Sequence, residues 1–226
     1  MAERNLHVNV KTAKARSNAS ARWLARQLND PYVKRAKAEG WRSRAAFKLL
    51  ELDAKFHLLK SGQRVVDLGA APGGWTQVAL RVAGERGRVV GLDLLEMDPI
   101  PGATLLQGDF TEEAAERAVL DALGGPADLV LSDMAPNTTG HGATDHLRIT
   151  ALAELALDFA ERTLAPGGAF CTKLFAGGAE RGMLARMKAG FAKVAHAKPP
   201  ASRKGSSELY VVAMGFRGMD ALPPRA

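Results

Sequence analysis

From about Gln63 onwards the chain alternates between short apolar runs and helix-like stretches. Apolar, β-branched runs bounded by Gly, Pro or Asp are typical of buried strands. Six such runs lie at residues 64–69, 87–94, 104–110, 127–133, 168–175 and 208–216. Helical patterns lie between them, including a long one over 145–164 and one after the third run that we expect Thr111 to cap. This alternation predicts an α/β protein with a mostly parallel sheet and helices on both faces.

Carboxylates follow several of these runs where each expected strand ends. They are Asp67, Asp93, Asp109 and Asp133. In open parallel sheets, ligands bind outside the carboxyl ends of the strands, at the point where the strand order reverses. The sequence therefore predicts a ligand site at this edge of the sheet.

The stretch VVDLGAAPGGWTQVAL, residues 65–80, reads as a strand, a glycine-rich turn and a helix. Its spacing, Gly69-x-x-x-Gly73-Gly74, is not the G-x-G-x-x-G of dinucleotide-binding proteins, which disfavours a nicotinamide-dependent dehydrogenase. No Lys-Ser/Thr pair follows, so the turn is not a P-loop either. Asp93 lies where an acid can bind a ribose diol, and Asp109 where a side chain could meet an adenine edge. A site that binds the ribose and base of an adenosine, with no loop to bind phosphates, indicates S-adenosylmethionine as the ligand. The alternative is that the glycine-rich turn serves only the packing of the strand against the helix.

Four motifs taken together carry a family resemblance. DLGAAPGGWTQ, SDMAPNTTG, KLFAGG and SRAAFKLLEL resemble the FtsJ/RrmJ family of ribose 2'-O-methyltransferases over residues 41–216. The resemblance implies a Rossmann-like class I S-adenosylmethionine-dependent methyltransferase with a mostly parallel seven-stranded sheet. It divides the chain into a basic N-terminal extension, residues 1–40, and a methyltransferase domain, residues 41–226.

The resemblance also implies roles for individual residues. The implied catalytic set is Lys48, Asp133, Lys173 and Glu208, and the implied cofactor contacts are Gly69, Gly73, Gly74, Trp75, Asp93, Asp109 and Asp133. The residues support the catalytic set independently, because charged side chains in otherwise apolar strands need partners. The alternative is an internal cluster of salt bridges without chemistry.

The expected reaction is an in-line attack of a ribose 2'-hydroxyl on the methyl carbon of a sulfonium. Lys173 is the candidate general base. The sequence leaves open whether it acts neutral, or acts charged by orienting the hydroxyl and stabilising the developing alkoxide. Methyltransferases that modify amino groups of bases commonly carry Asp/Asn-Pro-Pro-aromatic at this place. The sequence here is Asp133-Met134-Ala135-Pro136, which favours a hydroxyl target.

Positive charge is concentrated at the front of the chain. Residues 1–48 hold twelve Lys or Arg and three acids, whereas the whole chain has a net charge of +7. Such asymmetry favours a nucleic-acid partner, with a solvated basic arm as the alternative. We expect helices over 18–30 and 43–56, and further phosphate contacts from Lys198, Arg203 and Lys204. Tyr32 and Trp41 could stack on bases, or pack against the core.

The family resemblance implies a specific partner, a uridine in the A-loop of 23S rRNA within the large (50S) ribosomal subunit of a bacterial cytoplasm. We expect a monomer that binds neither DNA nor a membrane. The five histidines lack metal-ligand spacing, which predicts no metal site, and a lone cysteine, Cys171, fits a reducing compartment. The alternatives are a 2'-O-methyltransferase acting on tRNA or an mRNA cap, and a non-catalytic RNA-binding factor in ribosome assembly.

Overall fold

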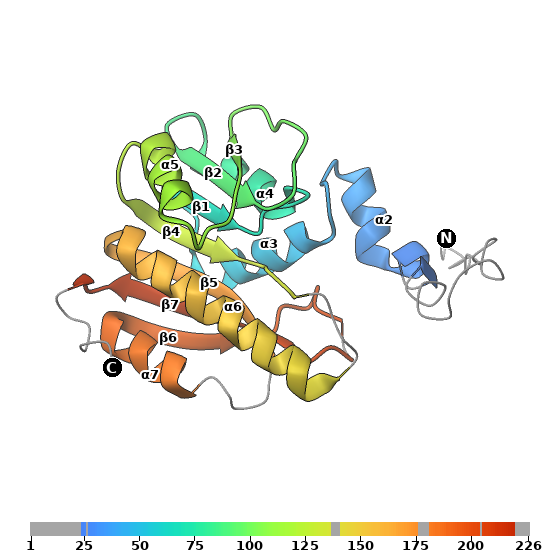
Figure 1. The fold of residues 1–226 in the computed structure, drawn as a ribbon. Helices are drawn as coiled ribbons and strands as arrows, with labels where there is room; N and C mark the ends of the chain where they lie inside the picture. The colour runs from blue at the N-terminus through green and yellow to red at the C-terminus, as the bar shows by residue number, and fades with distance from the viewer. Residues whose placement is uncertain (1–23, 26, 137–140, 176–180, 204, 220–226) are drawn as a thin grey trace.

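The computed structural model shows three layers, a central sheet with helices on each face (Figure 1). The structure describes residues 24, 25, 27–136, 141–175, 181–203 and 205–219. The seven strands are β1 Arg64–Leu68, β2 Arg88–Asp93, β3 Thr104–Gln107, β4 Ala127–Ser132, β5 Leu164–Phe175, β6 Phe191–Ala197 and β7 Glu208–Phe216. The helices are α2 Pro31–Ala38, α3 Ala45–Phe56, α4 Gly74–Ala83, α5 Glu113–Leu123, α6 Gly142–Thr163 and α7 Arg181–Gly190.

The strand order in the sheet is β3-β2-β1-β4-β5-β7-β6. Strands β1 to β5 pair in parallel, and β7 runs antiparallel between β5 and β6. The expectation of a mostly parallel seven-stranded sheet is therefore confirmed. The order reverses between β1 and β4, so the crevice for a ligand lies at the carboxyl ends of these two strands.

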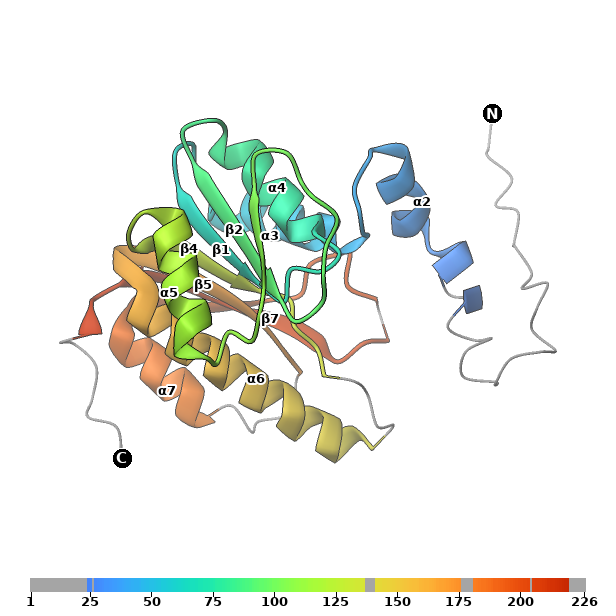
Figure 2. The same ribbon diagram turned by 45° about the horizontal axis from the view of Figure 1, so that its top comes forward.

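Successive residues of a strand point to opposite faces, and this gives the molecule two hydrophobic cores. Val66 and Val130 face the core under α5, α6 and α7, whereas Val65 and Leu129 face the core under α3 and α4. Figure 2 shows α3 and α4 on one side of the strands and α5, α6 and α7 on the other. The near-continuous apolar runs found in the sequence follow from burial on both faces.

Three details differ from the sequence-based expectations. Strand β6 was not among the six predicted strands. It is an edge strand with one neighbour, and its sequence, FAKVAHA, contains polar and small residues and no continuous apolar run. Helix α2 is also additional: Asp30 caps it through the N–H of Tyr32, and Pro31 starts it. Thr111 was expected to cap α5, but the N-cap residue is Glu112.

The front of the chain is described only in part. Residues 24, 25 and 27–29 are helical, and residues 18–23 and 26 of the helix expected over 18–30 lie outside the described residues. The last expected residue, Asp30, is not part of this helix because it is the N-cap of α2. The helix expected over 43–56 is confirmed as α3, which ends at His57 in a left-handed conformation. None of the helices in the described ranges is both long and apolar enough to cross a membrane.

Candidate active site

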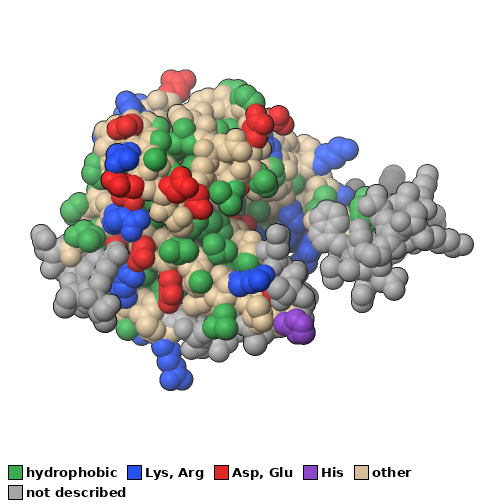
Figure 3. Space-filling model, in the orientation of Figure 1, with side chains coloured by type: hydrophobic (Ala, Val, Ile, Leu, Met, Phe, Trp, Pro, Cys, Tyr) green, Lys and Arg blue, Asp and Glu red, His purple; other side chains and the backbone are tan. Residues whose placement is uncertain are grey.

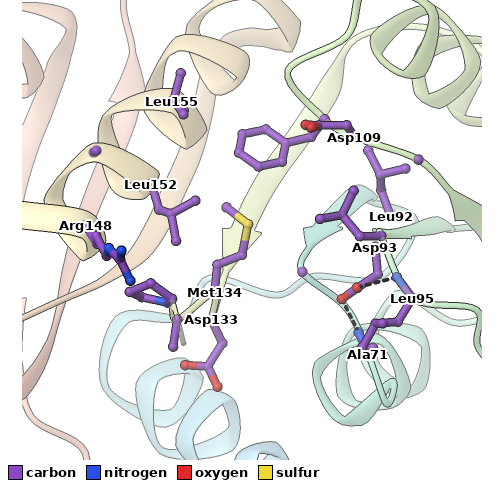
Figure 4. Close-up of a pocket in the computed structure, with 17 residues that line it drawn as sticks. Ala71, Leu92, Asp93, Leu95, Asp109, Asp133, Met134, Arg148, Leu152 and Leu155 are labelled. Carbon is purple, nitrogen blue, oxygen red and sulfur yellow. Dashed lines mark hydrogen bonds between the residues drawn. The ribbon is translucent and has the colours of Figure 1, made fainter. Parts of the chain in front are cut away.

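A cavity of about 710 Å³ opens at the carboxyl ends of the strands where the strand order reverses. It lies between the ends of β1 to β4 and the side of α6 (Figure 4). Asp93, Asp109 and Asp133 all line it, together with Met134 and Leu152. The expectation that acids at strand ends meet at one site is thus met for three of the four carboxylates, and Asp67 lines a smaller adjoining cavity instead.

Beside this cavity the structure brings together the four residues of the predicted catalytic set. The Nζ of Lys173 lies 2.9 Å from Oδ1 of Asp133 and 3.7 Å from Oε1 of Glu208. The Nζ of Lys48 lies 3.2 Å from the same Glu208 oxygen and 3.6 Å from the same Asp133 oxygen. Each lysine therefore contacts both carboxylates. We call this set, Lys48–Asp133–Lys173–Glu208, the ion cluster. Both lysines are buried, at 5% exposed, whereas the side chains of Asp133 and Glu208 are 16% and 19% exposed.

Four different elements supply the ion cluster. Lys48 projects inward from α3, Asp133 directly follows β4, Lys173 lies in β5, and Glu208 opens β7. The antiparallel register of β5 and β7 pairs Phe175 with Glu208. In such a ladder, side chains two residues apart share a face of the sheet, and Lys173 and Glu208 meet on the face that α3 covers.

Tyr210 joins the cluster, although sequence reasoning did not select it. It pairs directly with Lys173 across the sheet, and its hydroxyl donates a 2.5 Å hydrogen bond to Oδ1 of Asp133. Its ring is fully buried and packs against Trp75 with 5.7 Å between centroids. The available signal was its position two residues after Glu208, which places both side chains on one face.

Asp133 is the residue that links the ion cluster to the large cavity. Burial by itself raises the pKa of this carboxyl, but Lys173, Lys48 and the Tyr210 hydroxyl outweigh burial and hold its pKa below the usual value. Asp133 therefore stays ionised in the folded protein. Lys173 also donates a 2.6 Å hydrogen bond to the backbone carbonyl of Asp133, which fixes the end of β4.

The glycine-rich turn shapes the floor of the site. Gly69 has φ of 70°, and a Cβ there would lie 2.2 Å from Cγ of Met134, a side chain of the cavity wall. Gly73 has φ of 103°, and a Cβ there would lie 2.6 Å from Ile100. Both positions need glycine for backbone conformation and for space. Gly69 lines the cavity, whereas Gly73 of the predicted cofactor set does not and packs against Ile100 and Arg42.

Asp93 and Asp109 reach the cavity from neighbouring strands. The two carboxylate oxygens of Asp93 accept hydrogen bonds from the backbone N–H groups of Ala71 and Leu95, at 2.9 and 2.8 Å. Asp109 accepts from the N–H and hydroxyl of Thr111 at one oxygen. These bonds hold both carboxylates in place with acceptor capacity to spare, as hydrogen bonds to hydroxyl or amino groups of a ligand require.

A second, smaller cavity of about 170 Å³ adjoins the first and shares Gly69 and Asp133 with it. Gly74 and Trp75 of the predicted cofactor set line it. So does Ser43, whose Oγ is buried and has no hydrogen-bond partner in the described part of the chain. A buried hydroxyl without a partner is costly, so this cavity has the character of a polar subsite.

Asp67 also lines the smaller cavity and is 1% exposed. Burial raises the pKa of its carboxyl to about 7; hydrogen bonds from Thr76 oppose this shift, and the negative charges of Asp133 and Asp93 add to it. No Lys or Arg side chain pairs with Asp67 in the described structure. A cationic group in this cavity would therefore find an acid that can become its counter-charge.

Two groups of cations can be distinguished among the described residues up to position 48. Arg42, Arg44 and Lys48 contact the protein, whereas Lys34 and Lys37 of α2 are exposed. The two candidate stacking residues also contact the protein. Trp41 is 9% exposed within the core under α3 and α4, and Tyr32 packs against Phe47 and donates to Glu51. Of the two options left open for them, packing against the core is the one observed.

Some of the predicted functional residues lie outside the described part of the chain. The expected phosphate contact Lys204 and the glycines of KLFAGG fall in undescribed positions. Within the described ranges, no group of three or more His, Cys, Asp or Glu side chains could hold a metal ion. Arg203 is described, and it pairs with Asp30 at 3.2 Å.

Comparison with known proteins identifies the family. The model of the FtsJ-like methyltransferase family matches residues 41–216. A protein from Acidiphilium cryptum named ribosomal RNA large subunit methyltransferase E is 66% identical over 216 residues, 95% of this chain and 94% of that protein. A protein of the same name from Granulibacter bethesdensis is 66% identical over 93% of this chain and 90% of its own length.

A solved structure agrees with the sequence relatives. A Plasmodium falciparum protein described as a ribosomal RNA methyltransferase superposes with a TM-score of 0.72 at 32% identity, covering 79% of this chain and all of that chain. The sheet order, the site at its carboxyl edge and the match over residues 41–216 lead to one conclusion: the chain belongs to the FtsJ-like methyltransferase family.

Proposed function

We propose that this chain transfers a methyl group from S-adenosylmethionine to a ribose 2'-hydroxyl of large-subunit ribosomal RNA, at a uridine of the 23S A-loop. The observation that carries the proposal is the ion cluster Lys48–Asp133–Lys173–Glu208 at the edge of the 710 Å³ cavity, which three strand-end carboxylates line. The names of the relatives from Acidiphilium cryptum and Granulibacter bethesdensis support the RNA class. The family resemblance supports the ribose target and the bacterial cytoplasm as the place of action.

The two adjoining cavities fit the two ends of S-adenosylmethionine. Asp93 and Asp109 offer carboxylate acceptors for a ribose diol and an adenine amino group in the large cavity. The unpartnered Ser43 hydroxyl and the Asp67 carboxyl offer partners for the carboxylate and ammonium of the amino-acid end in the small one. When bound, the cofactor supplies an activated methyl group on a sulfonium.

The ion cluster would act on the acceptor hydroxyl. We assign to Lys173 the removal of the 2'-hydroxyl proton as the oxygen attacks. Lys48 also contacts both carboxylates, so Asp133 and Glu208 keep one cationic partner whatever proton Lys173 exchanges with the hydroxyl. Asp133, which lines the cavity, holds the amine at 2.9 Å, and alignment of hydroxyl and methyl donor supplies much of the remaining acceleration.

The proposed function predicts which RNA is modified. Labelled methyl groups from S-adenosylmethionine should enter methyl-deficient large ribosomal subunits, and mapping should find them on one ribose 2'-oxygen. Naked ribosomal RNA and tRNA serve as the competing acceptors. Preferential labelling of tRNA, or of a base amino group, would overturn the assignment. Cofactor binding with no transfer to any of these RNAs would favour the non-catalytic assembly factor.

Replacement of Lys173 separates a proton acceptor from a fixed positive charge. Lys173→Ala should reduce the methyl-transfer rate by about 10²–10⁴-fold, the usual contribution of a general base. Lys173→Arg should be equally slow, because a guanidinium keeps the charge and does not give up its proton. The affinity for S-adenosylhomocysteine, measured by calorimetry, should stay unchanged in both variants.

The control for these variants is Lys188→Ala on α7, an exposed lysine away from the site. It should transfer methyl groups at the wild-type rate. Substantial activity in Lys173→Arg would contradict the base role and assign to Lys173 an electrostatic one.

Cofactor affinity should depend on pH through Asp67. The cofactor ammonium favours ionised Asp67, and below a pKa of about 7 binding must first remove the proton from this acid. The affinity for S-adenosylhomocysteine should therefore rise about tenfold between about pH 6 and pH 8. Asp67→Asn should abolish the rise, and Asp121→Asn on the exposed face of α5 should keep it. A wild-type affinity that is flat over this range would contradict the assignment.

We propose that RNA lies along the outward side of α2. Lys34 and Lys37 are exposed, and no ion pair joins either of them to an acid within the described ranges. In Figure 3, Lys and Arg side chains lie on the right of the view, where Figure 1 labels α2, whereas the left edge of the view alternates between both signs. Lysines of this kind contact phosphates and position RNA without reading its sequence.

Charge reversal on α2 tests this surface. The double variant Lys34→Glu/Lys37→Glu should bind a large-subunit RNA fragment about tenfold or more weakly at moderate salt, with a shallower dependence on salt. The matched variant Lys188→Glu/Lys193→Glu changes net charge equally at exposed positions of α7 and β6. Fluorescence anisotropy at two salt concentrations measures both. Equal losses in the two variants would mean that net charge, and not this surface, governs binding.

A further inference from the structure

Arg42 belongs to the basic front of the chain, yet its side chain binds the protein's own backbone. One guanidinium nitrogen, Nη1, donates to the carbonyl of Asp98 at 2.7 Å and to that of Pro72 at 3.3 Å. The other, Nη2, donates to the carbonyl of Pro99 at 2.7 Å. Pro72 belongs to the glycine-rich turn, and Asp98 and Pro99 to the loop between β2 and β3. Arg42 therefore joins two segments that are separate in sequence.

The same two segments are joined a second time at the cavity itself. Asp93 accepts hydrogen bonds from the N–H of Ala71 in the turn and from the N–H of Leu95 in the loop (Figure 4). The turn and the loop are thus joined twice. The Asp93 carboxylate accepts hydrogen bonds from backbone N–H groups of both segments, and the Arg42 guanidinium donates hydrogen bonds to backbone carbonyls of both. Ala71 and Leu95 line the large cavity, and Arg42 acts on this wall from outside it.

The chemistry of the loop explains why an arginine occupies this position. The loop contains Pro99 and Pro101, which have no N–H, so it is rich in carbonyl acceptors and poor in donors. A guanidinium carries five N–H donors in a planar fork and can reach carbonyls in several directions at once. An ammonium is a compact charge that does not span the same set.

Arg42 is itself fixed by α4. Its backbone N–H donates to Oε1 of Gln77 at 2.8 Å, and the amide nitrogen of Gln77 donates to the carbonyl of Gly40 at 3.2 Å. Its Cδ lies 3.3 Å from where a Cβ on Gly73 would be. The side chain is therefore held against the turn, and its guanidinium reaches the loop from a defined point.

We infer that Arg42 is a positioning residue for the cofactor cavity and not an RNA contact. By tying the loop to the turn, it keeps Leu95 and Asp93 in the arrangement that the cofactor requires. Without it, binding would have to order the loop, and affinity would fall by that cost. The inference rests on the proposed function for the identity of the ligand.

The test compares Arg42→Ala and Arg42→Lys with Arg86→Ala, an exposed arginine in the turn before β2. Arg42→Ala should raise the Kd for S-adenosylhomocysteine about tenfold, the scale of a lost charge-assisted hydrogen bond. The Kd of Arg42→Lys should lie between those of Arg42→Ala and the wild type, and the Kd of Arg86→Ala should equal that of the wild type. In methyl transfer, KM for S-adenosylmethionine should rise while kcat stays unchanged. Affinity for the RNA fragment should not change.

A ligand-free measurement separates the inference from the proposed function. The Leu95 and Met97 amides should exchange hydrogen faster in Arg42→Ala than in the wild type. If Arg42→Ala does not fold, the same comparison is made with Arg42→Lys. An unchanged Kd for S-adenosylhomocysteine with unchanged exchange would overturn the inference, as would a loss of RNA affinity alone. Failure of the wild-type protein to bind S-adenosylhomocysteine would instead contradict the proposed cofactor.

Discussion

The site depends on a single carboxylate oxygen, Oδ1 of Asp133. It accepts a hydrogen bond from Tyr210 and lies 2.9 Å from the Lys173 amine and 3.6 Å from that of Lys48. Removing a charge from water costs several kcal/mol unless opposite charges and hydrogen bonds compensate. These partners come from α3, β5 and β7, so compensation is complete only when all three elements dock on the end of β4. The electrostatic requirement of the site is thus also a packing requirement of the fold.

Much of this arrangement could be predicted from the sequence, for a clear physical reason. Strands buried on both faces are nearly all apolar, so Lys173 and Asp133 stand out against their neighbours. Tyr210 does not, because an aromatic residue is ordinary in a strand. Ser43 carries no signal either, since a serine before a helix usually serves as a cap. The sequence analysis did not predict edge strand β6 or the short helix α2. Both are half-exposed, so few of their residues need to be apolar and no clear hydrophobic pattern marks them.

The net charge of a segment did not predict which of its Lys and Arg side chains are available to bind RNA. The front of the chain reads as one basic stretch, but Arg42 binds backbone carbonyls, Arg44 pairs with Asp30, and Lys48 enters the ion cluster. Only the three-dimensional arrangement separates these from the exposed Lys34 and Lys37. Composition reports how many positive charges a segment has, whereas partners decide which remain available to an external polyanion.

The reversed strand β7 has a consequence for how this chain can change in length. Glu208 and Tyr210 reach the ion cluster through their pairing with β5, and side chains alternate between faces along a strand. An insertion of one residue directly after Tyr210 would turn both side chains toward the opposite core, and an insertion between the two would turn Glu208 alone. The described residues of the preceding loop, 198–203 and 205–207, are not paired in the sheet, so a change in the length of this loop does not alter which face of the sheet the side chains of β7 point to. Length variation among related chains should therefore accumulate in that loop and stop abruptly at Glu208.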